Sequence, residues 1–307
     1  VREWADDGSF AATIAWTEGT GTVKVGDALG HETTYVFDRL GFTQRIVYPD
    51  GSSERFVRDR AHNVVEHHQV DGSIVRQQFD EAGRLTGRTS PGGARTRQHY
   101  DTQGRLILTE DALGKVWRRE YNAQGQVVQS VDPLGHKTQY DHDSQGRLSA
   151  VIDAKGGRKT FAYNGQGQLL SHTDCSGKTT AMAYDPDGRL QSQTDAAGGQ
   201  TQYRYSRGQL CAITHPDGSR VEFERDAEGR LLKQTDPNGH STQYRYGPAG
   251  QLIEQRNANG HTLAYQWDKS GRLNSLVNEN QARYSFEYDT AGGLRGRIRS
   301  CSWPGFH

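Results

Sequence analysis

Glycine recurs along this chain at intervals of about 21 residues, and a regular period of that length restricts the fold more than any other feature. One series closes Asp-x-x-Gly turns followed by Arg or Gln and then Leu or Val, as at Asp101-Thr102-Gln103-Gly104-Arg105. A second series closes Asp-Pro-x-Gly-His turns and lies midway between the turns of the first. A four-residue turn at each site leaves about six or seven residues, which suits a strand and is too short for a helix. Each repeat is therefore predicted to be a two-stranded hairpin.

The residues of these turns have mechanical roles. Asp caps backbone amides through its carboxylate, Pro presets the next φ, and Gly accepts the left-handed conformation of a type I turn with a bulge. Two slots lack glycine and carry His62 and Gln281, and the step into Gly208 is shorter than the others by a single position. We predict structural turn residues at Gly41, Gly83, Gly104, Gly114, Gly125, Gly135, Gly146, Gly167, Gly188, Gly229, Gly239 and Gly250.

An aromatic residue precedes most turns of the first series. In the segment Thr201–Tyr205, strand alternation places Thr and both Tyr rings on one face, and Gln and Arg on the other. Aromatic side chains on one face can stack between successive hairpins. We predict an aromatic ladder of Tyr100, Tyr121, Tyr140, Tyr163, Tyr184, Tyr205, Tyr246, Trp267 and Tyr288.

The repeat also predicts the architecture and its boundaries. Thirteen repeats occupy residues 30–294, after an end of a preceding sheet or a degenerate repeat at 1–29. A non-repeat tail at 295–307 is consistent with a truncated or frame-shifted end. About 26 strands would form a ribbon on the order of 125 Å wide, which strand twist should curl. The predicted class is all-β, a long, twisted antiparallel sheet that spirals into part of a shell.

Composition limits the partners. Only 33% of residues are hydrophobic and the mean hydropathy is -0.88, so apolar material suffices for a thin sheet rather than a thick core. Lys plus Arg and Asp plus Glu both total 37, so the field that a nucleic-acid binder needs is absent. No apolar run approaches the ~20 residues of a membrane helix. We predict neither nucleic acid as a partner nor a membrane span.

The motifs Tyr100-Asp101-Thr102-Gln103-Gly104-Arg105-Leu106 and Asp132-Pro133-Leu134-Gly135-His136 resemble the YD repeats of bacterial RHS proteins. Teneurins and the shell subunits of insecticidal toxin complexes share this repeat. The resemblance covers residues 30–294 and implies a β-sheet cocoon around a C-terminal toxin domain, in a polymorphic toxin used in interbacterial competition.

The resemblance also carries expectations about partners and location. The implied partners are the remainder of the shell, the toxin cargo and components of a secretion system. The implied location is bacterial, with synthesis in the cytoplasm followed by secretion or delivery to other cells. The chain departs from the family at its end, because the Pro-x-x-x-x-Asp-Pro-x-Gly-Leu stretch at which RHS cores are cut has no match here.

Two patterns could indicate metal sites. The histidines that follow turn glycines, namely His31, His136, His240 and His261, could form a metal ladder, but Ser, Lys and Gly occupy the same position in other repeats. The turn Asp residues could bind calcium, but capping explains them and the Gly-Gly-x-Gly-x-Asp pattern is absent. We predict no metal and no cofactor.

Catalysis has no support in the motifs. Gly-x-Ser-x-Gly, His-Glu-x-x-His and the phosphate-binding Gly-Lys-Ser/Thr loop are all missing. We predict no catalytic residue and no enzyme. The alternative to the shell is a binding module for carbohydrate or a cell surface, because aromatic rings interleaved with Gln, Asn and Arg are typical of surfaces that stack on sugars.

Overall fold

The computed structural model describes residues 2–3, 12–17, 21–289 and 299–300, and all the regular elements in these ranges are β-strands. Every pairing between them is antiparallel, as from β10 (Arg95–Tyr100) to β11 (Leu106–Glu110). The predicted all-β antiparallel class is confirmed. Within the described ranges there is no helix long and apolar enough to cross a bilayer.

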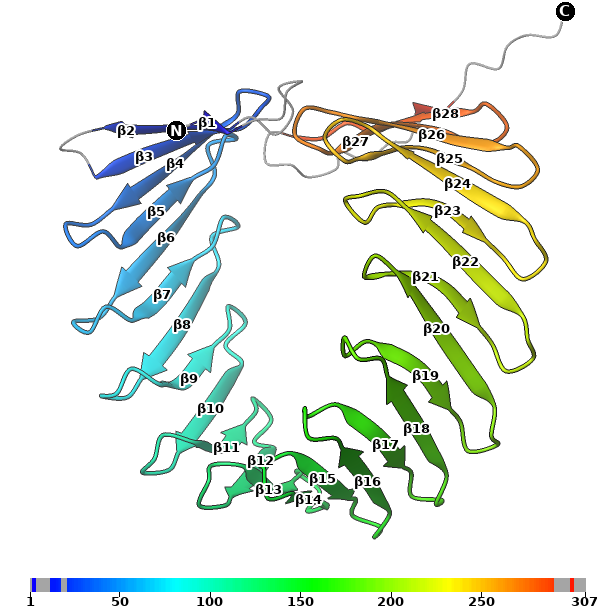
Figure 1. The fold of residues 1–307 in the computed structure, drawn as a ribbon. Helices are drawn as coiled ribbons and strands as arrows, with labels where there is room; N and C mark the ends of the chain where they lie inside the picture. Colours follow the sequence, from blue (N-terminus) through cyan, green and yellow to red (C-terminus); the bar gives the residue numbers. More distant parts are fainter. Residues whose placement is uncertain (1, 4–11, 18–20, 290–298, 301–307) are drawn as a thin grey trace, which may run out of the picture. The chain divides into compact units, whose positions relative to one another are not determined.

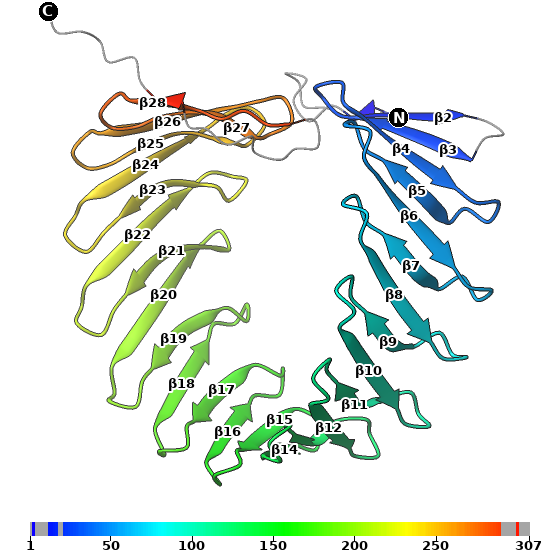
Figure 2. The same cartoon turned by 180° about the vertical axis from the view of Figure 1, so that it is seen from behind.

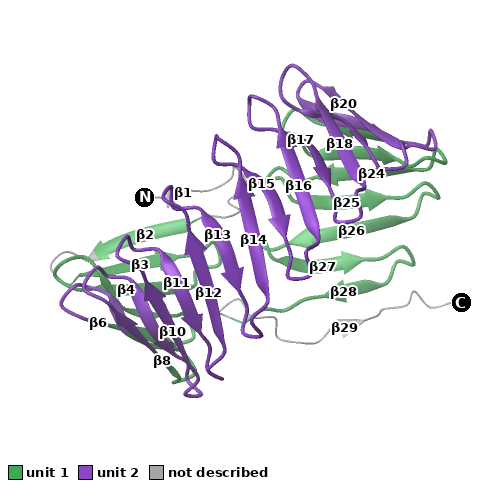
Figure 3. Cartoon of the chain, turned by 90° about the horizontal axis from the view of Figure 1, so that it is seen from below, with its two compact units in different colours: residues 1–58, 66–74, 221–307 green, residues 59–65, 75–220 purple. Residues whose placement is uncertain are grey.

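The chain divides into two compact units, coloured in Figure 3. The unit of residues 59–65 and 75–220 contains a run of hairpins in which each strand pairs with the next (Figures 1 and 2). Its turns alternate between the two ends of the strands. The strands are β8 (Ile74–Phe79), β9 (Leu85–Thr89), β10, β11, β12 (Val116–Tyr121), β13 (Val127–Val131), β14 (Lys137–His142), β15 (Leu148–Ile152), β16 (Arg158–Tyr163), β17 (Leu169–Thr173), β18 (Thr179–Tyr184), β19 (Leu190–Thr194), β20 (Gln200–Ser206) and β21 (Gln209–Thr214).

The unit of residues 1–58, 66–74 and 221–307 repeats the same hairpins. Its strands are β1 (Arg2–Glu3), β2 (Ala12–Thr17), β3 (Thr22–Gly26), β4 (Glu32–Phe37), β5 (Thr43–Val47), β6 (Ser53–Arg58), β22 (Arg220–Arg225), β23 (Leu231–Thr235), β24 (Ser241–Tyr246), β25 (Leu252–Arg256), β26 (Thr262–Trp267), β27 (Leu273–Val277), β28 (Arg283–Ser285) and β29 (Arg299–Ser300). β7 (Val64–His68) spans the boundary, and the first residues of β8 and β22, Ile74 and Arg220, also fall on its other side.

The ends of the predicted repeat array are partly described. β2 and β3 lie within residues 1–29 and pair antiparallel with each other, and β3 also pairs with β4. The expected tail at 295–307 lies outside the described residues except for β29. Gly292, the last glycine of the first series, also lies outside them.

The strands bury few side chains, and the two faces of the sheet differ in exposure. Along β20, Thr201, Tyr203 and Tyr205 are half-buried, while Gln202 and Arg204 on the other face are exposed, as the alternation predicts. Among the described residues, only Val23, Val75, Ala150 and Ala212 are buried apolar side chains. The sheet therefore lacks a thick core, and its hairpins depend on contacts between neighbouring repeats.

Candidate functional site

The turns are held by a repeated set of hydrogen bonds, shown well by the turn after β13. The backbone N–H of Gly135 donates to the carbonyl of Asp132 at 3.0 Å, and the N–H of Asp132 donates to the carbonyl of His136 at 3.0 Å. Asp132 Oδ1 accepts the N–H groups of Leu134 and His136, both at 2.9 Å. This is the capping that the sequence indicates, and it requires a left-handed residue at position 135, where φ is 84°.

The twelve predicted turn glycines all have φ between 75° and 88°. The two slots without glycine keep the conformation, with φ 67° at His62 and 63° at Gln281. The short step has a local cause, because Ser206 pairs directly with Gln209 around the two left-handed residues Arg207 and Gly208. A two-residue turn thus replaces the longer one there.

Neighbouring hairpins are joined by a contact that we call the clamp. It consists of the Arg that follows a turn glycine of the first series, the aromatic residue that precedes the next turn of that series, and the carbonyl of the Leu after the Arg. In one clamp the Arg105 guanidinium lies 4.9 Å from the centroid of the Tyr121 ring, and the Tyr121 hydroxyl donates to the Leu106 carbonyl at 2.8 Å. Arg105 also donates to the Asn122 carbonyl at 3.0 Å.

The clamp occurs where two strands separate. β11 and β12 pair only from Leu108 to Glu110 on the β11 side, so the first residues of β11 have no ladder partner in β12. The Tyr121 hydroxyl satisfies the Leu106 carbonyl across that gap. A register shift between Glu120 and Tyr121 precedes the turn and accompanies this arrangement.

Six Arg–Tyr clamps are present in the described residues, namely Arg84–Tyr100, Arg105–Tyr121, Arg147–Tyr163, Arg189–Tyr205, Arg230–Tyr246 and Arg272–Tyr288. The same leucine carbonyl accepts from Tyr184, beside Gln168, and from the Trp267 ring N–H, at 2.9 and 2.7 Å. Eight of the nine predicted ladder residues therefore make this bond.

Tyr140 is placed differently from the prediction. His142, not Tyr140, occupies the bulge position opposite Leu148 that the ladder residues share. Tyr140 lies two residues earlier on the same face, and its hydroxyl is 3.1 Å from Ser130 Oγ. The 21-residue interval counted from Tyr121 leads to position 142, where the residue is His142. The prediction chose Tyr140 instead because it is the aromatic residue next to that position.

The turn carboxylates are occupied within their own turns. Asp101 accepts the backbone N–H of Arg105 at 2.9 Å and its Nε at 2.6 Å. The backbone hydrogen bond from Arg105 is the strongest influence that lowers the pKa of Asp101; burial opposes it, and the Arg105 side chain adds to it. The arginine thus holds its own turn and covers the aromatic ring of the next repeat.

Three of the four turn histidines behave in the same way, whereas the turn of His261 has Asn257 in place of Asp. His31, His136 and His240 place Nδ1 at 3.0, 2.8 and 3.3 Å from the carboxylate of their own turn Asp. His67 and His68 take different partners, Glu54 at 2.7 Å and Glu66 at 3.1 Å. Within the described part of the chain, no three His, Cys, Asp or Glu side chains converge as metal ligands would.

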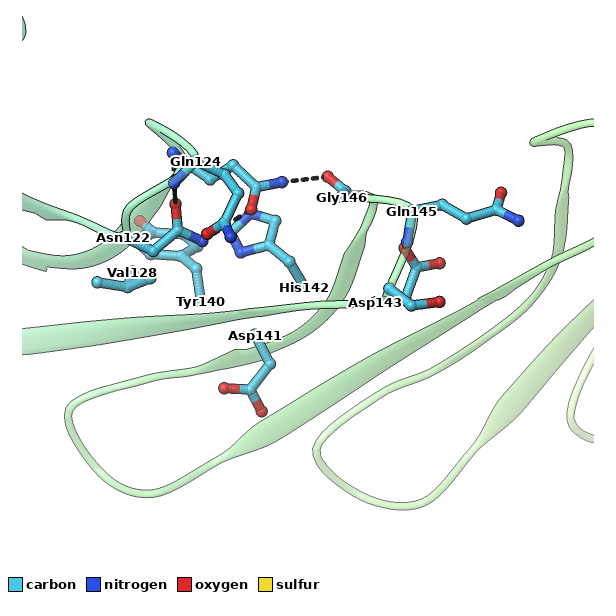
Figure 4. Close-up of a pocket in the computed structure, with 11 residues that line it drawn as sticks. Asn122, Gln124, Val128, Tyr140, Asp141, His142, Asp143, Gln145 and Gly146 are labelled. Carbon is cyan, nitrogen blue, oxygen red and sulfur yellow. Dashed lines mark hydrogen bonds between the residues drawn. The ribbon is translucent and has the colours of Figure 1, made fainter.

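The slot of Gln126 and His142 lacks both members of the Arg–Tyr pair, as does the slot of Gln209 and Arg225. Gln126 stands where the neighbouring repeat has Arg105, and His142 stands where it has Tyr121. A pocket of about 820 Å³ opens beside them, lined by Asn122, Gln124, Gln126, Val128, Tyr140, Asp141, His142, Asp143, Ser144, Gln145 and Gly146. Figure 4 shows Asn122, Tyr140 and His142 on one side, Asp143, Gln145 and Gly146 on the other, and Asp141 beyond its strand.

The side chains at this slot are bound less completely than in a clamp. Gln126 Nε2 donates to the Gly146 carbonyl at 2.6 Å, and its Oε1 accepts from Asn122 at 2.7 Å. The Nδ1 atom of His142 is buried and has no hydrogen-bond partner among the described residues. The sequence carries a signal for the pocket in the joint departure of Gln126 and His142 from the repeat, although Gln209 and Arg225 depart together in the same way.

The clamp limits sugar stacking on the tyrosine ladder. A sugar stacks on an open ring face, whereas a guanidinium lies 4.7–5.4 Å from the ring centroid in each of the six Arg–Tyr clamps. One face of each of these tyrosines is therefore in use within the protein.

The repeat matches a known family. The family described as RHS Repeat matches residues 58–96, 79–116, 100–136, 121–158, 163–199, 184–220, 225–262 and 248–283. No curated protein matches the chain.

Several solved structures share the fold. The crystal structure of TcdB2-TccC3-Cdc42 is 15% identical over 93% of this chain, with a TM-score of 0.54. The Tc holotoxin pore of Photorhabdus luminescens with a TccC3 mutation is 16% identical over 95%, with a TM-score of 0.54. The crystal structure of TcdB2-TccC3 without the hypervariable C-terminal region is 17% identical over 95%, also at 0.54. The chain spans 22% of each of these chains.

Proposed function

The chain belongs to the RHS repeat family, and on that premise we propose that it is a non-catalytic segment of the shell of an RHS-type polymorphic toxin. The proposed shell encloses a toxin cargo and carries it to competing cells. The chain would be made in the bacterial cytoplasm and secreted or delivered as part of a larger assembly. Its partners would be the remainder of the shell, the cargo and components of the secretion system.

The observation that carries this proposal is the use of the polar side chains. Turn Asp, Arg and His residues, which could serve catalysis or metal binding, bond within their own turns or clamp the next repeat. A surface built in this way provides a wall rather than a reactive centre. The fold that the chain shares with TcdB2-TccC3 supports the same role.

Protection from protease tests the proposal. The polypeptide encoded around this chain would be purified with its downstream segment and treated with a nonspecific protease, beside the same downstream segment expressed alone. We expect the segment to survive within the assembly and to be cut rapidly when isolated. Equal cleavage rates, with the repeats themselves intact, would contradict enclosure.

A further inference from the structure

The strongest unexplained feature is the pocket at Gln126 and His142. Elsewhere the Arg–Tyr clamp supplies a guanidinium that stacks on an aromatic ring and, at Arg105 and Arg147, donates to a backbone carbonyl of the next turn. A glutamine lacks the guanidinium, and an imidazole is shorter than a phenol. The pocket therefore occupies the place that the chain's own arginine fills in neighbouring repeats.

The lining of the pocket has the complementary chemistry for a planar cation. It contains the side chains of Gln124, Ser144 and Gln145 and no Lys or Arg, and the Asp143 carboxylate in its lining is already paired with Arg147 Nε at 2.7 Å. The rings of Tyr140 and His142 provide flat surfaces on one side (Figure 4). Amide and hydroxyl oxygens accept the in-plane N–H groups of a guanidinium, while ring faces attract its charge.

We propose that this pocket binds an arginine side chain of a second polypeptide, which completes in trans the clamp that Gln126 and His142 leave incomplete. The geometry of the six internal clamps is the basis for choosing a guanidinium over a neutral sugar, because the protein itself uses a guanidinium at this position. This site is additional to the proposed shell role and does not depend on enclosure of a cargo.

The test uses N-acetyl-arginine amide as the probe and ¹³C-labelled histidine rings in the full chain as the reporter. We expect saturable shifts of the His142 ring signals with N-acetyl-arginine amide. N-acetyl-citrulline amide, which has the same shape without the charge, should bind roughly tenfold more weakly. Equal binding of both probes, no shift with either, or a shift with maltose but not with arginine would each overturn the proposal.

Variants distinguish binding of the probe in the pocket from nonspecific binding elsewhere on the protein. The double variant Gln126→Arg with His142→Tyr restores a clamp from within and should abolish binding, read from the Val128 methyl signals. Gln126→Arg alone should also weaken it. Gln168→Arg changes the same turn position in the repeat where Tyr184 keeps its leucine bond, and it should leave binding unchanged. Binding that survives the double variant in a folded protein would refute the site.

Discussion

The guanidinium of Arg105 lies 4.9 Å from the ring centroid of Tyr121, and the two residues belong to successive hairpins. The Tyr121 hydroxyl donates to the carbonyl of Leu106, the residue next to Arg105, so side chain and backbone of one repeat both contact the same tyrosine. The sheet has few buried apolar side chains among its described residues. Such clamps therefore supply many of the specific contacts that hold neighbouring repeats together.

A double-mutant cycle tests the clamp. Arg105→Met and Tyr121→Leu should each lower the free energy of unfolding, and the two should couple by about 0.5–2 kcal/mol because they remove one shared contact. Gln103→Ala, in the exposed part of the same turn, is the control and should change little. Thermal and chemical unfolding measure the effect, and strictly additive losses would show that the stacking contributes nothing.

The contribution of the Tyr121 hydroxyl hydrogen bond to stability can be measured separately from that of the aromatic ring. Tyr121→Phe keeps the aromatic surface and removes the donor to Leu106, so the free energy of unfolding should fall by about 1 kcal/mol. Hydrogen exchange would report where the loss lies, with faster exchange concentrated in β11 and β12. A uniform change along the chain would argue against a local clamp.

The turn glycines can be tested for backbone conformation alone. Gly135 has φ 84° and nothing within 4 Å of an added Cβ, so Gly135→Val should cost about 1–3 kcal/mol through strain and not through collision. Gly188→Val adds a contact to the same strain, because a Cβ at Gly188 would lie 3.2 Å from Gln168 Nε2. The matched control is Gly165→Val, since Gly165 is equally open but does not have a positive φ. Equal melting temperatures for the Gly135 and Gly165 variants would contradict the turn assignment.

Acid should weaken the turns. The pKa of Asp101 is lowered in the fold, chiefly by the Arg105 backbone hydrogen bond, relative to about 3.9 in an unfolded chain. The ionised Asp101 carboxylate therefore contributes to the free energy of unfolding above about pH 4. This contribution is lost as pH falls through the lowered pKa of Asp101 in the folded protein. Melting temperature measured from pH 7 to 3 should show the advantage of the wild type over Asp101→Asn disappearing in this acid range. A constant difference across the range would be inconsistent with the lowered pKa.

The incomplete clamp predicts a stabilising change. His142 Nδ1 is buried without a partner among the described residues, and such a group costs about 1–3 kcal/mol. Replacing His142 with Tyr, together with Gln126→Arg, should raise the melting temperature because it supplies both missing members of the clamp. Gln168→Arg supplies only the arginine of a clamp, so it should raise the melting temperature by a smaller amount. A lower melting temperature for the double variant would show that the pocket is shaped for another purpose.

Prediction from sequence succeeded where spacing alone decides the outcome. The turn at Asp132 needs a cap and a left-handed residue at fixed positions, so its local chemistry is readable in the residues, and even His62 and Gln281 keep the conformation. The clamp was not predicted, although the spacing between Arg105 and Tyr121 recurs in other repeats. Which side chains meet across a gap depends on how the bulge before Tyr121 directs its ring, and residue types alone do not specify that direction.

Electron cryomicroscopy of the complete polypeptide together with the proposed toxin cargo tests the proposed shell most directly. We expect a hollow particle whose wall is built from these hairpins, with the proposed cargo inside. An open or solid particle, or a cargo held outside the wall, would contradict the proposed shell.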